Sequence, residues 1–241
     1  MITTRDEKLE TLSDRYKLVP TKTIADKFKS MGFVVDNYSE VKVRKGSRQG
    51  YQKHQVRLSN PNIMSTTHPD IKLQLLVTNS HDGLSSLILQ LGFFRFVCGN
   101  GLVVGETFEK VRLRHTGMII EEIDNAVERI VAQIKRLDDS ITKMKTKVLN
   151  EEEKRLFLEA AVKLRNDKMT ASDIVIPILR TEDATDDVFT FYNRVQESLI
   201  RGGTEYTNSL GRTRQLRTVS NIKRMDEINQ GLFDIAMQFA A

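Results

Sequence analysis

The sequence of 241 residues has little of what several protein classes require. Its single cysteine excludes a disulfide within the chain, so we expect a reducing, cytoplasmic compartment. No apolar run approaches the ~20 residues of a membrane-spanning helix, and the opening stretch MITTRDEKLE lacks the apolar core of a secretory signal. The four histidines include no pair at metal-ligand spacing, so we expect neither a structural zinc nor another cofactor.

Positive charge is concentrated in two stretches, although the formal net charge is only +5. The first has no acid, and its six bases are Lys42, Arg44, Lys45, Arg48, Lys53 and Arg57. The second contains one acid, Glu205, and its six bases are Arg201, Arg212, Arg214, Arg217, Lys223 and Arg224. Such concentration is typical of contact with a polyanion. The alternative is that both stretches are merely solvated loops.

Alternation and turn residues predict a β-rich half up to residue 118. A short helix is expected over Thr21–Met31, with Thr21 or Thr23 as its cap and Gly32 as its stop. The turn KGSRQG, between VKVR and YQKHQVRL, predicts a hairpin with a strongly basic polar face. Four further strands are predicted in IKLQLLVTNS, LSSLILQLGFFRFVC, NGLVVG and KVRLRHTG.

Helical periodicity dominates residues 119–241. The apolar residues from Ile119 to Val148 recur in steps of three and four, which predicts one amphipathic helix of about 30 residues. Asn150 should cap the next helix, and Thr185 or Asp186 should cap a later one. A polar basic loop and a terminal helix follow. We therefore predict an α+β fold in which an N-terminal meander with a short helix packs on the long helix and a helical half, sharing one core.

The segment GFFRFVCGNGLVVG admits three interpretations. Cys98 could be a nucleophile or metal ligand, served by His81 or His115 and oriented by Asp82. Gly-Asn-Gly could cradle a phosphate, but a strand rather than a helix is expected after it. The apolar flanks favour the third interpretation, a buried structural segment. The loop NSHDGLSS is likewise either an acid/base or metal site, or a capped turn.

The basic hairpin gives the strongest functional signal. Alternate residues of a strand lie ~6.6–7 Å apart, close to the spacing of phosphates along a nucleic-acid strand. Tyr51 could stack on a base, and Tyr206 could do so in the second stretch, whose glycines suggest mobility. The predicted nucleic-acid contacts are Arg44, Lys45, Arg48, Tyr51, Lys53, Arg57, Arg212, Arg214 and Arg217.

The segments TNSHDGLSSLILQLGFFRFVCGNGLVV and VRLRHTG together resemble a family of phage- and plasmid-like proteins of unknown function. Its motifs correspond here to the loop at 79–83, to Arg95, Cys98, Asn100 and Gly101, and to His115 with Gly117. The resemblance covers residues 78–117 well and the helical half loosely. It implies a mobile-element setting and no activity. The order of helix, basic meander and long helix is also similar to Rad52-like annealing proteins, at the level of fold alone.

These observations lead us to expect a non-catalytic, single-stranded nucleic-acid-binding protein of a phage or plasmid. Its expected role is strand annealing or recombination, as a homo-oligomer in the host cytoplasm and without membrane attachment; the choice between DNA and RNA stays open. The alternative is a protein–protein interaction module that inhibits a host defence factor. An enzyme using Cys98, His81 and Asp82 is the minor third hypothesis.

Overall fold

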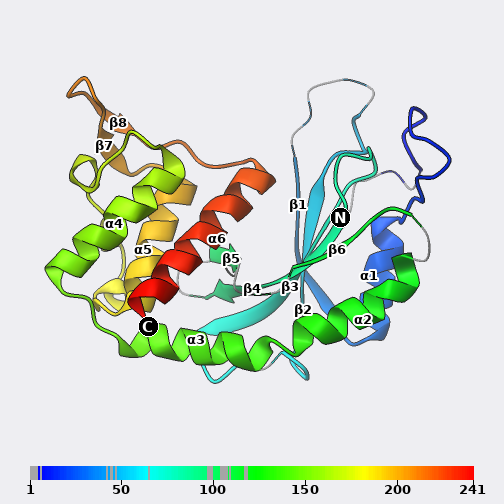
Figure 1. Cartoon of the computed structure of the whole chain (residues 1–241), viewed down its shortest axis with the longest axis horizontal. Helices are drawn as coiled ribbons and strands as arrows, with labels where there is room; N and C mark the ends of the chain where they lie inside the picture. The colour runs from blue at the N-terminus through cyan, green and yellow to red at the C-terminus, as the bar shows by residue number, and fades with distance from the viewer. Residues whose placement is uncertain are drawn as a thin grey trace. The chain divides into compact units, whose positions relative to one another are not determined.

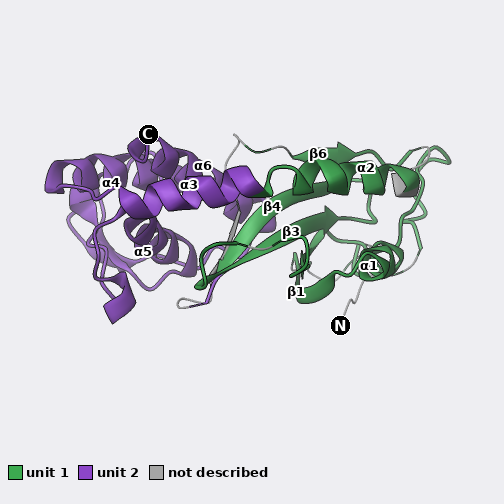
Figure 2. Cartoon of the chain, turned by 90° about the horizontal axis from the view of Figure 1, so that it is seen from below, with its two compact units in different colours: residues 1–94, 108–134 green, residues 95–107, 135–241 purple. Residues whose placement is uncertain are grey.

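The computed structural model describes residues 5, 7–41, 43, 46, 48–64, 66–96, 100–103, 108, 110–116 and 119–241 (Figure 1). The predicted α+β class is confirmed. The chain forms two compact units, unit 1 with residues 1–94 and 108–134, and unit 2 with residues 95–107 and 135–241 (Figure 2). Each unit is therefore assembled from two separate stretches of the sequence.

Unit 1 is built on a meander with strand order β1-β2-β3-β4, and β6 pairs with β4. The pairs β1–β2, β2–β3 and β4–β6 are antiparallel. The strands are β1 (Val34–Glu40), β2 (His54–Ser59), β3 (Ile71–Asn79), β4 (Leu87–Arg95) and β6 (Val111–Leu113). The predicted hairpin is thus confirmed, but its first strand lies before Val41 instead of after it.

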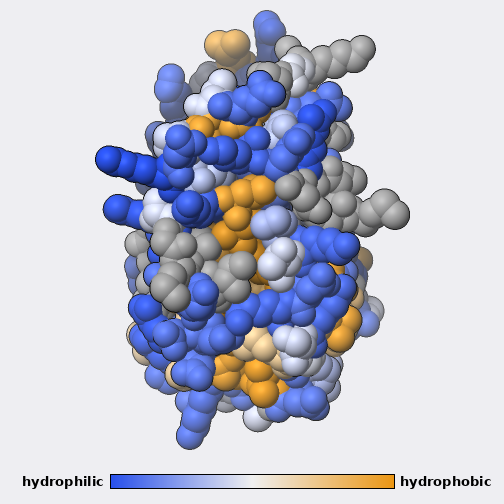
Figure 3. All heavy atoms as spheres, turned by 90° about the vertical axis from the view of Figure 1, so that its right-hand side faces the viewer, coloured by the Kyte–Doolittle hydropathy of each residue, from blue (hydrophilic) through white to orange (hydrophobic). Residues whose placement is uncertain are grey.

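Hydrophilic side chains cover most of the face shown in Figure 3, around a band of hydrophobic residues.

Two helices complete unit 1, α1 (Thr21–Ser30) and α2 (Ile119–Val131). Helix α1 buries Ile24 and Phe28 and ends before Gly32, whose φ of +85° favours glycine. The predicted side-chain cap is wrong, because Pro20 occupies the N-cap and no side chain caps the helix. Thr21 is instead buried, and its hydroxyl faces His54 of β2 and His81 in the loop after β3.

Unit 2 is mainly helical. Its strand β5 (Asn100–Val103) is followed by helices and a small hairpin. These are α3 (Ile134–Thr146), α4 (Glu151–Arg165), α5 (Val188–Arg201), β7 (Glu205–Thr207), β8 (Thr213–Gln215) and α6 (Ile222–Phe239), with single 3₁₀ turns at Ala171–Asp173 and Thr181–Asp183. Phe157, Tyr192 and Phe233 are fully buried in its core. The stretch 205–219, predicted as a loop, therefore contains a hairpin.

The single long helix predicted over 119–148 is wrong. The chain forms α2 and α3, and the Gln133 amide donates to the Ile130 carbonyl (3.1 Å), a contact one residue tighter than the α-helical repeat. Ile123, Ile130, Leu137 and Met144 are all buried, so the apolar stripe continues through the break. Because neither glycine nor proline marks the interruption, the periodicity could not predict it.

Helix α4 begins with the cap that its sequence predicts. The Asn150 side chain accepts the Glu153 amide hydrogen (2.9 Å), and the Glu153 carboxylate accepts the Asn150 amide hydrogen (2.8 Å). This reciprocal arrangement satisfies two amides that the helix itself leaves without partners.

We expect Asn150→Ala to lower the free energy of unfolding by about 1 kcal/mol, because the Glu153 amide loses its acceptor. Urea denaturation of the full chain measures this change. The matched control is Asn62→Ala, in an exposed turn where the side chain makes no hydrogen bond within the described residues. Equal stability of the two variants would show that the cap contributes nothing.

Candidate nucleic-acid interface

The first basic stretch does not form the exposed track that its sequence predicts. Strand β2 lies between β1 and β3, and all its residues are buried. Arg57 is only 8% exposed, and its Nη1 donates to Gln74 Oε1 (3.3 Å). Its assignment as a phosphate contact is wrong, because a central strand covered on both faces offers no side chain to a polymer.

Tyr51 is also wrongly assigned as a stacking residue. It is 5% exposed, its hydroxyl donates to Glu7 Oε1 (2.9 Å), and the Arg5 guanidinium lies 5.3 Å from its ring centroid. Both the ring and the hydroxyl are therefore engaged within unit 1.

The other predicted cations of this stretch differ in their exposure to solvent, and two of them are not described by the structure. Arg48 is exposed and Lys53 is half-buried. Arg44 and Lys45 lie outside the described residues. In the part that the structure describes, the early hairpin thus presents isolated cations and no continuous row.

The second basic stretch forms a hairpin, β7–β8 (Figure 1). Within it, Tyr206 pairs with Arg214. The turn is held by Asn208, whose side-chain oxygen accepts the amides of Leu210 and Arg212, both at 3.0 Å. Gly211 has a φ of +69°, which a side chain would strain. A well-formed turn therefore fixes the strand that carries the arginines.

The arginine hairpin, which we define as residues 204–217, presents Arg212, Arg214 and Arg217 to solvent. Within the described residues, none of these guanidinium groups makes an ion pair or a hydrogen bond to the protein. Arg212 and Arg214 are two residues apart in extended chain, so they lie on one face at ~7 Å spacing. Tyr206 is half-buried beside them, and Glu205 is exposed on the facing strand.

One further arginine contacts this hairpin, and a second lies near the first. Sequence reasoning missed Arg165 and gave Arg224 no role. Arg165 donates to the Arg217 carbonyl, and Arg224 donates to the Leu164 carbonyl at the end of α4. Burial and, second, the Arg224 charge lower the pKa of Arg165, which shows that the two cations crowd each other. The signal for Arg165 was its place in the last helical turn, where the helix dipole favours bases.

The histidines proposed for catalysis lie in a buried polar cluster of unit 1. His54 and His81 are both 0% exposed. Their Nδ1 atoms lie 2.9 Å from the Gln52 carbonyl oxygen and 2.7 Å from the Arg5 carbonyl oxygen, so each Nδ1 carries the hydrogen. Both Nε2 atoms face the Thr21 hydroxyl, which contacts His54 and lies 3.4 Å from His81.

The described residues do not show the catalytic hypothesis as a whole. Cys98 lies outside the described residues. The Asp82 carboxylate accepts the Leu84 amide hydrogen (3.1 Å), so it closes the loop in the way a capped turn does. Burial is the main cause that lowers the pKa of His54 to about 4, and this histidine is neutral at pH 7.

Arg95, from the segment with the single cysteine, has a structural partner in unit 2. Its Nη1 donates to Asp183 Oδ1 (2.6 Å), and the two side chains are 4% and 2% exposed. Asp183 Oδ2 accepts from Arg180 (3.0 Å), which also forms a two-pronged pair with Glu197, both bonds at 2.8 Å. Asn100 and Gly101 are the first residues of strand β5, as expected of a structural segment, whereas Gly99 lies outside the described residues.

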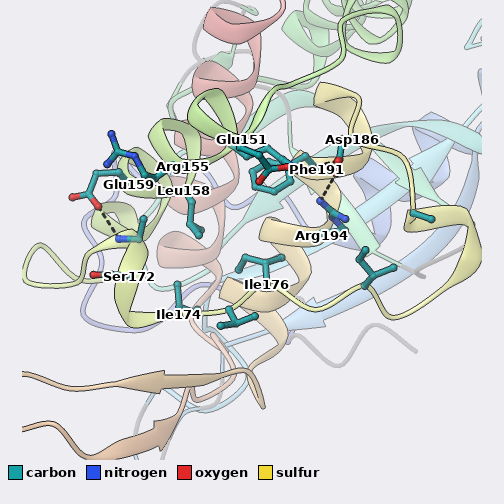
Figure 4. A pocket seen from close by; sticks show the side chains of 15 residues that line it. Glu151, Arg155, Leu158, Glu159, Ser172, Ile174, Ile176, Asp186, Phe191 and Arg194 are labelled. Atoms are coloured by element: carbon teal, nitrogen blue, oxygen red, sulfur yellow. Dashed lines mark hydrogen bonds and ion pairs between the residues drawn. The ribbon is translucent and has the colours of Figure 1, made fainter.

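Unit 2 also contains a pocket of about 590 Å³ beside α4, α5 and residues 171–178 (Figure 4). Its charged wall is internally paired, since Asp186 accepts from Lys154 (2.8 Å) and from Arg194 (3.2 Å). The apolar lining includes Leu158, Ile174, Ile176 and Phe191. Such a pocket suits an apolar group better than an anion.

The described residues show neither a membrane span nor a metal cluster. No helix among them combines the length and apolarity of a membrane span. No group of three or more His, Cys, Asp or Glu side chains in the same part of the chain could hold a metal ion.

Fold and site together define an α+β protein with an exposed arginine-rich hairpin and buried histidines. The chain belongs to the family described as "Domain of unknown function (DUF932)", whose model matches residues 8–229. It is similar to the UPF0380 proteins YfjQ and YafZ of Escherichia coli (strain K12), each 31% identical over 236 residues, covering 96% of this chain and 85% of the relative. No solved structure matches. The expected membership of a family of unknown function is confirmed.

Proposed function

We propose that this protein is a non-catalytic, single-stranded nucleic-acid-binding protein that holds its ligand on the arginine hairpin. One observation carries the proposal: Arg212, Arg214 and Arg217 are exposed, and no carboxylate pairs with them within the described residues. Arg165, which donates to the Arg217 carbonyl, adds a further positive charge, whereas Arg224 pairs with Glu227 (3.4 Å). A cluster of unpaired guanidinium groups attracts a row of phosphates because it releases the counterions condensed on them.

The geometry suits a single strand in two respects. Arginine spacing along β8 is close to the phosphate spacing of one strand. Tyr206 lies opposite Arg214 in the hairpin, so a base whose phosphate contacts Arg214 has an aromatic side chain within reach. These contacts are made with phosphates and with the flat face of a base, which every nucleotide offers. They therefore favour binding without sequence specificity.

The test is a salt titration of the triple variant Arg212→Ala/Arg214→Ala/Arg217→Ala with a single-stranded oligonucleotide. Loss of three phosphate contacts should weaken binding roughly tenfold or more at low salt and reduce the slope of log affinity against log salt by about 2. Fluorescence anisotropy at several salt concentrations measures both quantities.

The matched control is Lys135→Ala/Arg136→Ala/Lys143→Ala, which removes three exposed cations of α3 in the same unit. It changes the net charge by the same amount, so it should leave the slope nearly unchanged if the hairpin is the site. An unchanged slope in the hairpin variant, or an equal loss in both variants, would exclude the hairpin.

The finer role within this proposal is strand annealing or recombination by a homo-oligomer of a phage or plasmid. It is supported only by the order of elements in the first half, since α1 is followed by a meander and then by α2. Annealing of complementary oligonucleotides, measured together with sedimentation of the protein, tests it. If the protein is a monomer that binds strands without accelerating their pairing, the annealing role is excluded and the binding function is retained.

The second candidate function is the protein–protein module. It is favoured by the exposed apolar side chains Val175, Ile178 and Leu179, which are 82%, 57% and 58% exposed beside the pocket of Figure 4. Exposed apolar groups beside a pocket are typical of a surface that another protein covers. This function predicts no salt-dependent binding of oligonucleotides, so the titration above separates the two candidates.

A further inference from the structure

A separate pocket of about 330 Å³ lies within unit 1, where the segments 13–16, 83–86 and 114–116 meet. Two of these segments carry motifs that the arginine hairpin does not use, the loop NSHDGLSS and the end of VRLRHTG. Its volume is at the lower end of the ~300–1,000 Å³ range of small-molecule sites. The pocket therefore suits a small ligand.

Hydrogen bonds fix the walls of this pocket. The Lys17 amide donates to the His115 carbonyl (2.7 Å), and the Tyr16 hydroxyl donates to the Ser80 carbonyl (3.0 Å). The Tyr16 ring stacks on the His115 ring with 4.8 Å between the centroids. Gly83 has a φ of +73°, and a Cβ there would lie 2.6 Å from a Leu12 methyl carbon. The three segments are thus held together before any ligand binds.

The charge at the pocket is positive. Arg15 and Arg114 line it, both are exposed, and neither pairs with a carboxylate within the described residues. Two acids lie nearby: Asp14 is 3.5 Å from Lys8 Nζ, and Asp82 accepts the Leu84 amide hydrogen while its charge still acts on Tyr16. Two unpaired guanidinium groups beside one small pocket favour an anion with several oxygens.

Hydroxyl groups and one imidazole add further hydrogen-bonding capacity. Ser13, Ser86 and Thr116 line the pocket, and their hydroxyls make no hydrogen bonds within the described residues. His115 is 6% exposed, and its Nε2 has no partner there although its Nδ1 lies 3.3 Å from the Lys17 carbonyl oxygen. Burial, with a smaller contribution from His81, lowers the pKa of His115, so its ring is neutral and Nε2 can accept an O–H hydrogen.

We propose that this pocket binds a phosphate monoester. Arg15 and Arg114 would pair with the phosphate oxygens, and the Ser13, Ser86 and Thr116 hydroxyls would donate to them. His115 would accept a hydroxyl hydrogen of the group that carries the phosphate. The proposal does not rest on the arginine hairpin, which belongs to unit 2. The same chemistry is offered by a nucleoside monophosphate and by the 5′-phosphate of a strand.

Calorimetric titration of the full chain with inorganic phosphate and with a nucleoside 5′-monophosphate tests the site. We expect both to bind, and Arg15→Ala/Arg114→Ala should weaken binding at least tenfold. Arg112→Ala is the matched control, because Arg112 is an exposed arginine of β6 that does not line the pocket. Absence of binding at millimolar concentrations, or equal affinity of the double variant and the control, would overturn the proposal.

The source of the phosphate is identified with oligonucleotides, 5′-phosphorylated or ending in a 5′-hydroxyl, in the background of the hairpin triple variant. If the phosphorylated strand binds more tightly, and Arg15→Ala/Arg114→Ala abolishes this difference, the pocket binds strand ends. Equal binding of the two strands, with retained binding of the monophosphate, assigns it to a small ligand. The triple variant keeps these results independent of the hairpin proposal.

Discussion

Replacing Asp183 by asparagine is expected to lower the free energy of unfolding by about 3–5 kcal/mol, because it removes one charge of the buried ion pair between Asp183 and Arg95. Arg180 keeps its two-pronged pair with Glu197, so the loss falls mainly on Arg95. A loss of this size is a large part of the ~5–15 kcal/mol that stabilises a typical domain. Chemical denaturation followed by far-ultraviolet circular dichroism measures it.

Two controls make this result specific to burial. Glu152→Gln breaks the exposed pair with Arg155 (2.7 Å) and should change stability little, because water screens that pair. Arg95→Met/Asp183→Asn removes both buried charges and should recover part of the loss. If Asp183→Asn is no more harmful than Glu152→Gln, the buried pair does not hold unit 2 together.

Acidification from pH 6.5 towards pH 4 should cost the fold up to ~3 kcal/mol through His54. The folded protein holds the pKa of His54 at about 4, whereas the unfolded chain has the ordinary value of 6.5. Between these values the unfolded chain binds more protons, so the free energy of unfolding falls as the pH falls. The cause is burial, which penalises a charged ring beside His81 and Thr21.

Urea denaturation at pH 7.5, 6, 5 and 4.5 measures this dependence. His54→Gln removes the titrating ring, so its stability should depend less steeply on pH across the same window, even though its stability at pH 7.5 is lower. His115, whose pKa is also lowered, contributes in the same direction and stays in both proteins. Identical pH profiles of the wild type and His54→Gln would contradict the assignment.

The sequence predicted most elements because local patterns determine them. Alternation in β3, the periodicity of α5 and the cap at Asn150 are local signals, and each corresponds to an observed element. The break between α2 and α3 has no such signal. Strand pairing is non-local, so alternation in β2 was interpreted as a solvent-facing pattern although the strand lies between two others.

The sequence predicted the exposure of candidate site residues only where that exposure does not depend on tertiary packing. Arg212, Arg214 and Arg217 lie in a stretch too polar to be buried, and they are exposed as expected. Arg57 and Tyr51 are buried, and their hydrogen-bond partners Gln74 and Glu7 are distant in the sequence. Arg165 was missed for the same reason, since its proximity to Arg217 arises only in the folded chain.

The division of unit 2 between residues 95–107 and 135–241 has a practical consequence for deletion studies. A fragment that begins at residue 135 contains the whole arginine hairpin and starts where the second stretch of unit 2 starts, so it is an obvious choice for a truncation. It nevertheless lacks Arg95 and strand β5, so the buried Asp183 carboxylate would lose one of its two guanidinium partners and would keep only Arg180, which is shared with Glu197. We expect that fragment to misfold, and a negative binding result obtained with it would report on lost charge compensation rather than on the hairpin.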